Sequence, residues 1–165
     1  HLFCCFVLEH LADPLSAVQQ MCRLVKPGGT VTVIEGDHGS FLLHPHSDAA
    51  MQTVTALITL QERQGGNSLI GRQLYGLLSR AGLSEVQVAP RTVYVDASCP
   101  RLVEGFSRNT FVAMVESIGD QAIGAGLIDQ HTWDEGIADL RRGTVEDGSF
   151  TYTFFKAVGA VSGAT

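Results

Sequence analysis

The stretch that decides the fold comes first, residues 1–37, HLFCCFVLEHLADPLSAVQQMCRLVKPGGTVTVIEGD. Leu2–Leu8 is a continuous run of Leu, Phe, Cys and Val, which is typical of a strand buried on both faces of a parallel sheet. Thr30–Ile34 is a second strand-like run, rich in β-branched residues. Because a helical pattern lies between them, the stretch predicts a right-handed strand–helix–strand unit with parallel strands.

The helix of this unit carries signals at both of its ends. Asp13 stands directly before Pro14, which is the pattern of an N-cap followed by proline at the first helical position. Apolar residues recur at helical spacing from Leu15 to Val25. Lys26–Gly29, with the sequence KPGG, then supplies a cation, a helix breaker and a residue that tolerates a left-handed backbone.

The remainder of the chain continues with helices and strands of ordinary length. We expect helices from Ser47 or Asp48 to Gln64, from Ser68 to Ala81, from Pro100 to Ile118 and from His131 to Arg142, and strands at Glu85–Val95 and at 148–161. Pro90 predicts a bulge or an edge position in the first of these strands, and Asp147-Gly148 predicts a turn before the second. A length of 165 residues fits one domain.

Composition excludes several classes of partner. A net charge of −6 without a local cluster of Lys and Arg argues against nucleic acid. The longest apolar runs, such as Val54–Leu60, are much shorter than the roughly 20 residues of a membrane span, so none is expected. The four cysteines show no CxxC spacing, which favours free thiols in a reducing, cytoplasmic setting over disulfides or metal ligation.

The order of several motifs resembles a known family. LEHL at 8–11, DP at 13–14, Leu24, KPGG at 26–29, Glu35 and Asp37 together resemble the centre of a class I S-adenosylmethionine-dependent methyltransferase of the ubiquinone and menaquinone branch. GRQLYGLLSRAGLSEVQV at 71–88 is similar to the helix and sixth strand of that family, and FTYTFFKAVG at 150–159 to its antiparallel seventh strand. The resemblance covers essentially the whole chain.

The resemblance implies an α/β, Rossmann-like fold. The family's sheet has the strand order 3-2-1-4-5-7-6, and this chain would supply strands 4-5-7-6 with flanking helices and a helical insertion, about residues 99–145, before the last strand. All 165 residues would then form the C-terminal part of a methyltransferase domain. The half with the glycine-rich cofactor loop is missing from the sequence, so we expect the exposed edge of the first strand to be covered by a missing N-terminal segment or by a homo-oligomer.

The resemblance also implies S-adenosylmethionine as the cofactor, bound beside the carboxyl end of the first strand. Phe6, Val7, Leu8 and Glu9 are the expected cofactor contacts. His10 is the candidate general base, with Glu9 beside it, because imidazole titrates near neutral pH. The alternative is that Glu9 and His10 are only a polar pair that ends the strand and orders the loop.

A second group of residues is expected to contact a small-molecule acceptor. It comprises residues at the end of the next strand, one on a following helix and two in the insertion: Glu35, Asp37, His38, Arg72, Phe106 and Asn109. With His44 and His46 nearby, a metal site is an alternative, although the spacing matches no established ligand pattern. Core packing is the alternative for the apolar residues of the insertion.

The predicted function is S-adenosylmethionine-dependent methyl transfer to a small-molecule acceptor, as part of a longer or completed domain. The first alternative is a non-catalytic, truncated methyltransferase-like module for ligand binding or dimerisation. The second is a methyltransferase-like fold that catalyses cyclisation or isomerisation without methyl transfer.

Overall fold

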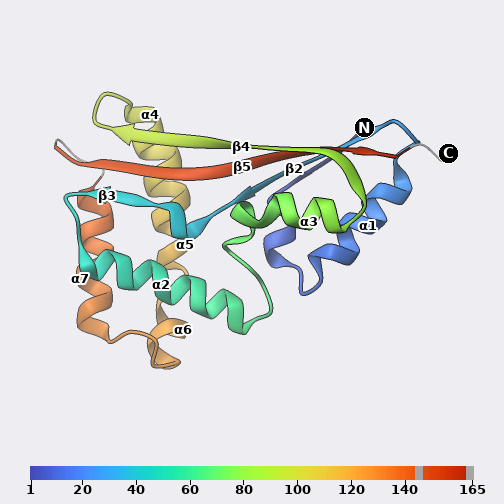
Figure 1. Cartoon of the computed structure of the whole chain (residues 1–165). Helices are drawn as coiled ribbons and strands as arrows, with labels where there is room; N and C mark the ends of the chain where they lie inside the picture. Colours follow the sequence, from blue (N-terminus) through green and yellow to red (C-terminus); the bar gives the residue numbers. More distant parts are fainter. Residues whose placement is uncertain (144–146, 163–165) are drawn as a thin grey trace. The chain divides into compact units, whose positions relative to one another are not determined.

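The computed structural model describes residues 1–143 and 147–162, which form two compact units (Figure 1). The first unit consists of His1–Asp37, Gly65–Arg91 and the described residues from Thr153 onward. The second consists of His38–Gln64 and the described part of Thr92–Tyr152. Two long strands, β4 (Leu83–Asp96) and β5 (Ser149–Val161), contribute residues to both units.

The sheet of the first unit has the predicted strand order. β1 (Leu2–Cys5) pairs in parallel with β2 (Thr30–Gly36), and β2 pairs antiparallel with β5. β4 pairs with β5 on the other side, where Ser84 Oγ donates to the Ala160 carbonyl oxygen at 3.2 Å. The order β1-β2-β5-β4 is the expected 4-5-7-6, and the Rossmann-like α/β assignment is confirmed.

Helix α1 (Pro14–Leu24) begins and ends where its capping residues predict. Asp13 Oδ1 accepts a hydrogen bond from the Ser16 amide at 2.9 Å, and Pro14 occupies the first turn. Gly28 takes a φ of 78°, a left-handed conformation that ends the turn before β2 and that glycine adopts without steric cost. Local capping chemistry therefore fixes how the chain passes from β1 to β2.

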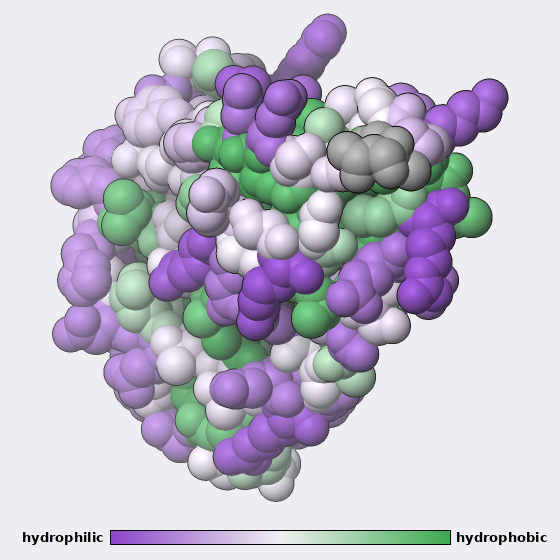
Figure 2. All heavy atoms as spheres, turned by 45° about the vertical axis from the view of Figure 1, so that its right-hand side comes forward, coloured by the Kyte–Doolittle hydropathy of each residue, from purple (hydrophilic) through white to green (hydrophobic). Residues whose placement is uncertain are grey.

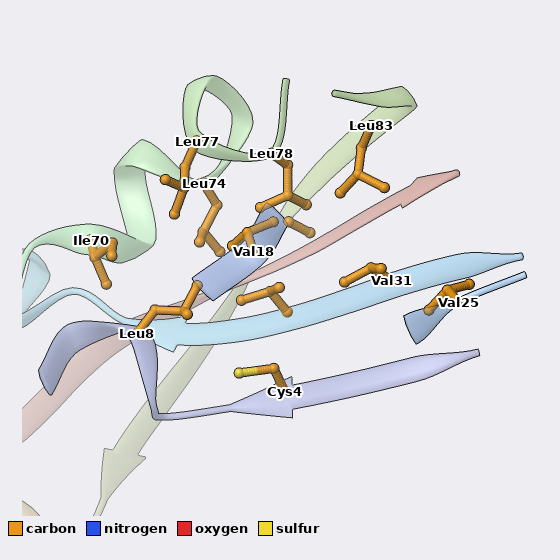
Figure 3. Close-up of a cluster of buried hydrophobic side chains, with 12 residues drawn as sticks. Cys4, Leu8, Val18, Val25, Val31, Ile70, Leu74, Leu77, Leu78 and Leu83 are labelled. Carbon is orange, nitrogen blue, oxygen red and sulfur yellow. The ribbon is translucent and has the colours of Figure 1, made fainter. Parts of the chain in front are cut away.

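A buried apolar cluster attaches two helices to this sheet (Figure 3). Val18 of α1 lies close to Leu74, Leu77 and Leu78 of α3 (Leu74–Arg80), which follows the 3₁₀ turn η3 (Ile70–Gln73). Residues of β1 and β2 complete the cluster from below, among them Val31. Burying each of these side chains contributes about 1.5–3 kcal/mol, which is more than helix propensity supplies.

The second unit is mainly helical. α2 (Asp48–Arg63) begins at its N-cap Ser47 and packs against α7 (Gln130–Arg142). A Cβ added at Gly136 would lie 2.6 Å from the Ala49 carbonyl oxygen, so glycine is what lets the two helices approach this closely. The remaining elements are η2 (His38–Ser40), β3 (Leu42–His44), α4 (Pro100–Leu102), η4 (Val103–Val112), α5 (Ala113–Glu116) and α6 (Gly119–Gly124).

One predicted strand is wrong in its extent, and one predicted helix is confirmed with a different hydrogen-bond pattern. The strand predicted at Leu2–Leu8 ends at Cys5, because Phe6 adopts a φ of 55° and the 3₁₀ turn η1 (Leu8–His10) follows. The helix predicted at Pro100–Ile118 runs without a break from Pro100 to Glu116, and its middle part, η4, is a π-helix. The spacing of apolar residues does not distinguish a buried strand residue from a buried turn residue. Leu8 continues the apolar run because its side chain packs into the core, although its backbone lies in a turn.

Two short elements were not predicted, and one predicted helix starts late. β3 pairs with the beginning of β5, and α6 lies within the glycine-rich segment 119–126. The helix predicted from Ser68 becomes α-helical only at Leu74.

None of the helices in the described ranges has both the length and the apolar character needed to cross a bilayer. On the face that Figure 2 presents, hydrophobic residues are interspersed with hydrophilic ones.

Candidate functional site

The loop that follows β1 is the centre of the candidate site in the first unit. The Phe6 amide donates to the Ile34 carbonyl oxygen at 2.9 Å and so extends the pairing with β2 by one residue. The left-handed φ of Phe6 then turns the chain into η1, which brings Glu9 and His10 to the carboxyl end of the strand. In open α/β sheets this edge is where ligands bind.

The side chain of Glu35, on β2, accepts hydrogen bonds from the backbone of this loop. Its side chain is completely buried, and Oε1 accepts hydrogen bonds from the Val7 amide at 3.1 Å and the Leu8 amide at 2.9 Å. Burial raises the pKa of Glu35, and the amides of Leu8, Val7 and Glu9 act in the opposite direction. The carboxyl group is thus directed at the backbone of the loop.

Glu9 and His10 form an adjacent acid–imidazole pair. Glu9 Oε1 lies 3.5 Å from His10 Nε2, and the Glu9 carbonyl oxygen accepts a hydrogen bond from the Asn67 amide at 2.7 Å. Burial raises the pKa of Glu9, and the neighbouring His10 acts against that rise. The His10 side chain is 64% exposed and that of Glu9 is 10% exposed, so the imidazole is accessible from solvent beside a largely buried carboxyl group.

The predicted cofactor residues divide into exposed and buried ones. Phe6 and Val7 are 45% and 43% exposed and offer apolar surface at the strand end. Leu8 is fully buried in the core cluster, so its side chain fixes the loop. The Phe6 ring lies 5.3 Å, centroid to centroid, from that of Phe154 on β5.

Asp37 and Arg72, both predicted to contact substrate, pair with each other. Arg72 Nε and Nη2 each donate to Asp37 at 2.7 Å. The Asp37 side chain is buried, whereas that of Arg72 is 48% exposed. A Cβ at Gly71 would lie 2.6 Å from the Gly36 carbonyl oxygen, so glycine there lets η3 approach the end of β2 and positions the arginine.

His38 lies in the second unit, in an aromatic cluster that we define as Phe41, Phe106, Phe111, Phe150 and Tyr152. His38 Nδ1 is 2.7 Å from the Tyr152 hydroxyl oxygen, and both side chains are buried. Tyr152 was not among the predicted site residues. The alternation along β5 marks it as inward-facing, but nothing in that pattern indicates its partner.

The two insertion residues have different surroundings. Phe106 packs against Phe150 and Tyr152, with ring centroids 6.0 and 5.9 Å apart. Asn109 is exposed, and its Nδ2 donates to Glu104 Oε1 at 3.2 Å. It also lines a surface pocket of about 620 Å³ between η4 and α7, together with Arg108, Val112, Ala113, Glu116, Ala138, Arg141 and Arg142.

The histidines considered as metal ligands do not gather. His46 Nε2 pairs with Asp48 Oδ1 at 2.9 Å, and His44 ends β3. Within residues 1–143 and 147–162, no three His, Cys, Asp or Glu side chains come together in a way that could hold a metal ion.

The structure therefore brings Glu9, His10 and Glu35 together at one loop, and Asp37 and Arg72 at the neighbouring strand end. His38 and Phe106 share the aromatic cluster of the second unit. Sequence reasoning missed the contact between Glu35 and the loop amides as well as the contact between His38 and Tyr152, because neither pattern indicates which partner the side chain will bind.

Comparison with known proteins identifies one family. A sequence model of a methyltransferase domain matches residues 3–88, just over half of the chain. Among curated proteins, an uncharacterised 37.1 kDa protein in transposon TN4556 of Streptomyces fradiae is 32% identical over 123 residues. That alignment covers 74% of this chain and 32% of the relative, so the chain spans about a third of the relative's length.

Solved structures of similar fold have low sequence identity. A Bacillus halodurans protein, provisionally named a methyltransferase, is 13% identical with a TM-score of 0.49, covering 97% of this chain and 68% of that one. Phosphoethanolamine N-methyltransferase 2 of Haemonchus contortus, solved with S-adenosyl-L-methionine, is 14% identical with a TM-score of 0.48, covering 97% and 32%.

Proposed function

This chain belongs to the methyltransferase domain family, and on that premise we propose that it is part of an enzyme that transfers a methyl group from S-adenosylmethionine to a small-molecule acceptor. The observation that carries the proposal is the match over residues 3–88, which includes the loop with Glu9 and His10 and the ends of β1 and β2. The four free cysteines are in keeping with a cytoplasmic enzyme.

The residues after β1 fit one side of such a cofactor. Phe6 and Val7 present exposed apolar surface at the carboxyl edge of the sheet, where nucleotide-like ligands bind in open α/β folds. The sequence holds no GxGxG turn after a strand, so the chain offers only part of a cofactor site. When bound there, S-adenosylmethionine would supply an electrophilic methyl group.

His10 is the proposed general base. In the tautomer that carries its proton on Nε2, the nitrogen 3.5 Å from Glu9 Oε1, Nδ1 is the nitrogen available to accept a proton from a hydroxyl or amine acceptor. Glu9 would hold this tautomer and stabilise the imidazolium that forms. Arg72, fixed by Asp37, and the residues His38, Phe106 and Asn109 remain proposed acceptor contacts, and the pocket beside Asn109 has the volume of a small-molecule site.

Two experiments test the proposal: binding of S-adenosylmethionine without an acceptor, and turnover with an acceptor. Titration calorimetry of the full-length protein with S-adenosylmethionine is expected to give saturable heat, and absence of binding would contradict the proposal. With an accepted substrate in hand, His10→Ala should lower kcat about 100-fold. His131→Ala is the matched control, because His131 is an exposed histidine 4.0 Å from a glutamate, and it should leave kcat unchanged.

A non-catalytic association module is the second candidate, favoured by the outer edge of β1. In the described residues β1 pairs with β2 alone, and Phe3 on it is 59% exposed. An unpaired strand edge with exposed apolar side chains promotes association. If this is the function, Phe3→Asp should convert an oligomer to a monomer in light scattering, and a wild-type monomer would rule it out.

A further inference from the structure

Glu35 carries a buried carboxyl group that has no role in the methyl transfer proposed above. It is the last residue but one of β2, its side chain has no exposed surface, and its Oε2 accepts no hydrogen bond within the described residues. Burying a carboxyl group is unfavourable unless hydrogen bonds or opposite charges compensate for its lost hydration. An apolar side chain at this position would avoid that cost, so the role of Glu35 must lie in what it binds.

Glu35 binds two consecutive backbone amides of the loop after β1. Oε1 accepts from Val7 at 3.1 Å and from Leu8 at 2.9 Å, across 28 and 27 residues of sequence. Both amides follow Phe6, whose φ of 55° is unfavourable for a residue with a Cβ. Such a conformation persists only where the surroundings fix it, and it occurs preferentially at functional sites.

The loop is held at three successive points. The Ile34 carbonyl oxygen accepts from Phe6, Glu35 accepts from Val7 and Leu8, and the Asn67 amide donates to the carbonyl oxygen of Glu9. The first and third contacts are between backbone groups, so no side-chain substitution at those partners removes the bonding atoms. The middle contact depends on the side chain of Glu35, and it lies where the chain turns from strand to 3₁₀ helix.

We propose that Glu35 is a positioning residue: its carboxyl group holds the amides of Val7 and Leu8 and thereby fixes the direction in which the loop presents Phe6, Val7 and His10. The contact of this loop with cofactor and acceptor rests on the proposed function. The role of Glu35 in fixing the loop is independent of that function, because it follows from the hydrogen bonds alone.

Hydrogen exchange of the full-length protein, without ligand, tests the proposal. In Glu35→Ala, peptides covering residues 6–10 should exchange about tenfold faster than in the wild type, while peptides of α1 remain protected. Glu35→Gln retains a side-chain oxygen in place of Oε1 and should stay within about threefold of the wild type. Glu62→Ala, which removes an exposed carboxyl group on α2, is the control and should change neither region.

The outcomes separate this inference from the proposed function. Unchanged exchange at residues 6–10 in a folded Glu35→Ala protein would overturn the role of Glu35, whatever the protein binds. If Glu35→Ala does not fold, Glu35→Gln takes its place: exchange at residues 6–10 tenfold or more faster than in the wild type, in a folded Glu35→Gln protein, would overturn the role, because the retained oxygen should preserve the contact. For an active enzyme, Glu35→Ala should raise KM for S-adenosylmethionine about tenfold, whereas His10→Ala should lower kcat with little change in KM.

Discussion

The interiors of the two units use polar groups in different ways. In the first unit, buried carboxyl groups lie at strand ends and accept hydrogen bonds from neighbouring segments. Glu35 accepts from the loop amides, and Asp37 accepts from the half-exposed Arg72. In the second unit, the buried polar pair His38 and Tyr152 is enclosed by phenylalanine rings. Asp37 and His38 are consecutive in sequence, yet they belong to these two settings.

We infer from this contrast, on the proposed function, that the chemistry takes place at the strand ends of the first unit. A buried carboxyl group that accepts hydrogen bonds from a neighbouring loop or arginine positions that neighbour at a cost in stability, as expected for a functional edge. The hydrogen bond between His38 and Tyr152 lies within the aromatic cluster, where it helps to specify how the rings pack. The first unit is thus organised around its strand ends, and the second around its core.

The largest expected effect is on the core of the second unit. Phe150 is fully buried and packs against the rings of Phe41, Phe106 and Phe111, so Phe150→Ala should lower the free energy of unfolding by about 3–5 kcal/mol. Denaturant unfolding with hydrogen exchange would measure it. Loss of protection in the second unit alone supports the division into two units. Equal loss in both units would show that they do not differ in this way.

Arg72→Ala should have the next largest effect. The substitution removes two charge-assisted hydrogen bonds from the buried Asp37, and partial exposure of the arginine limits the cost to about 2 kcal/mol. Arg91→Ala, at an exposed position of the same unit, is the control for loss of a positive charge. If the two variants unfold at the same denaturant concentration, the pair does not stabilise the strand end.

Tyr152→Phe should cost less, about 1 kcal/mol, because it removes the hydroxyl that pairs with His38 Nδ1 and retains the ring contacts. Tyr75→Phe, at an exposed tyrosine, should stay within about 0.5 kcal/mol of the wild type. Denaturation midpoints compare the two. A loss well above that of Arg72→Ala would mean that the polar pair matters more in the second unit than in the first.

The smallest effect concerns pH. Burial raises the pKa of Glu35 above its ordinary value of 4.5 in the folded state, so between these values the folded protein binds more protons than the unfolded chain. This contribution to stability is full below pH 4.5 and is lost as pH rises through the folded pKa. Glu9 behaves in the same way.

Glu35→Gln should therefore flatten the decline of unfolding free energy above pH 4.5, with a residual slope from Glu9. His10, Cys4 and Cys5 also lie near these groups, and burial with the neighbouring Glu35 raises the pKa of Cys4 to about 11, outside this window. An unchanged slope in Glu35→Gln would show that Glu35 is not the group that titrates.

Much of the first unit was predictable because its signals are local. Asp13 and Pro14 begin α1, Gly28 forms the turn between α1 and β2, and the apolar runs give β1 and β2. The turn at Phe6 was not predictable, since an apolar residue with a left-handed backbone is held by contacts from residues about 28 positions away. The pairing of His38 with Tyr152 spans 114 residues and depends on tertiary packing in the same way.

Hydrogen exchange with and without S-adenosylhomocysteine tests the central claim most directly, that the loop after β1 is the cofactor-facing edge. Measured on the full-length protein, the ligand should slow exchange in peptides covering residues 6–10, with little change in the aromatic cluster of the second unit. Protection confined to the second unit, or no protection at residues 6–10 under saturating ligand, would contradict the account.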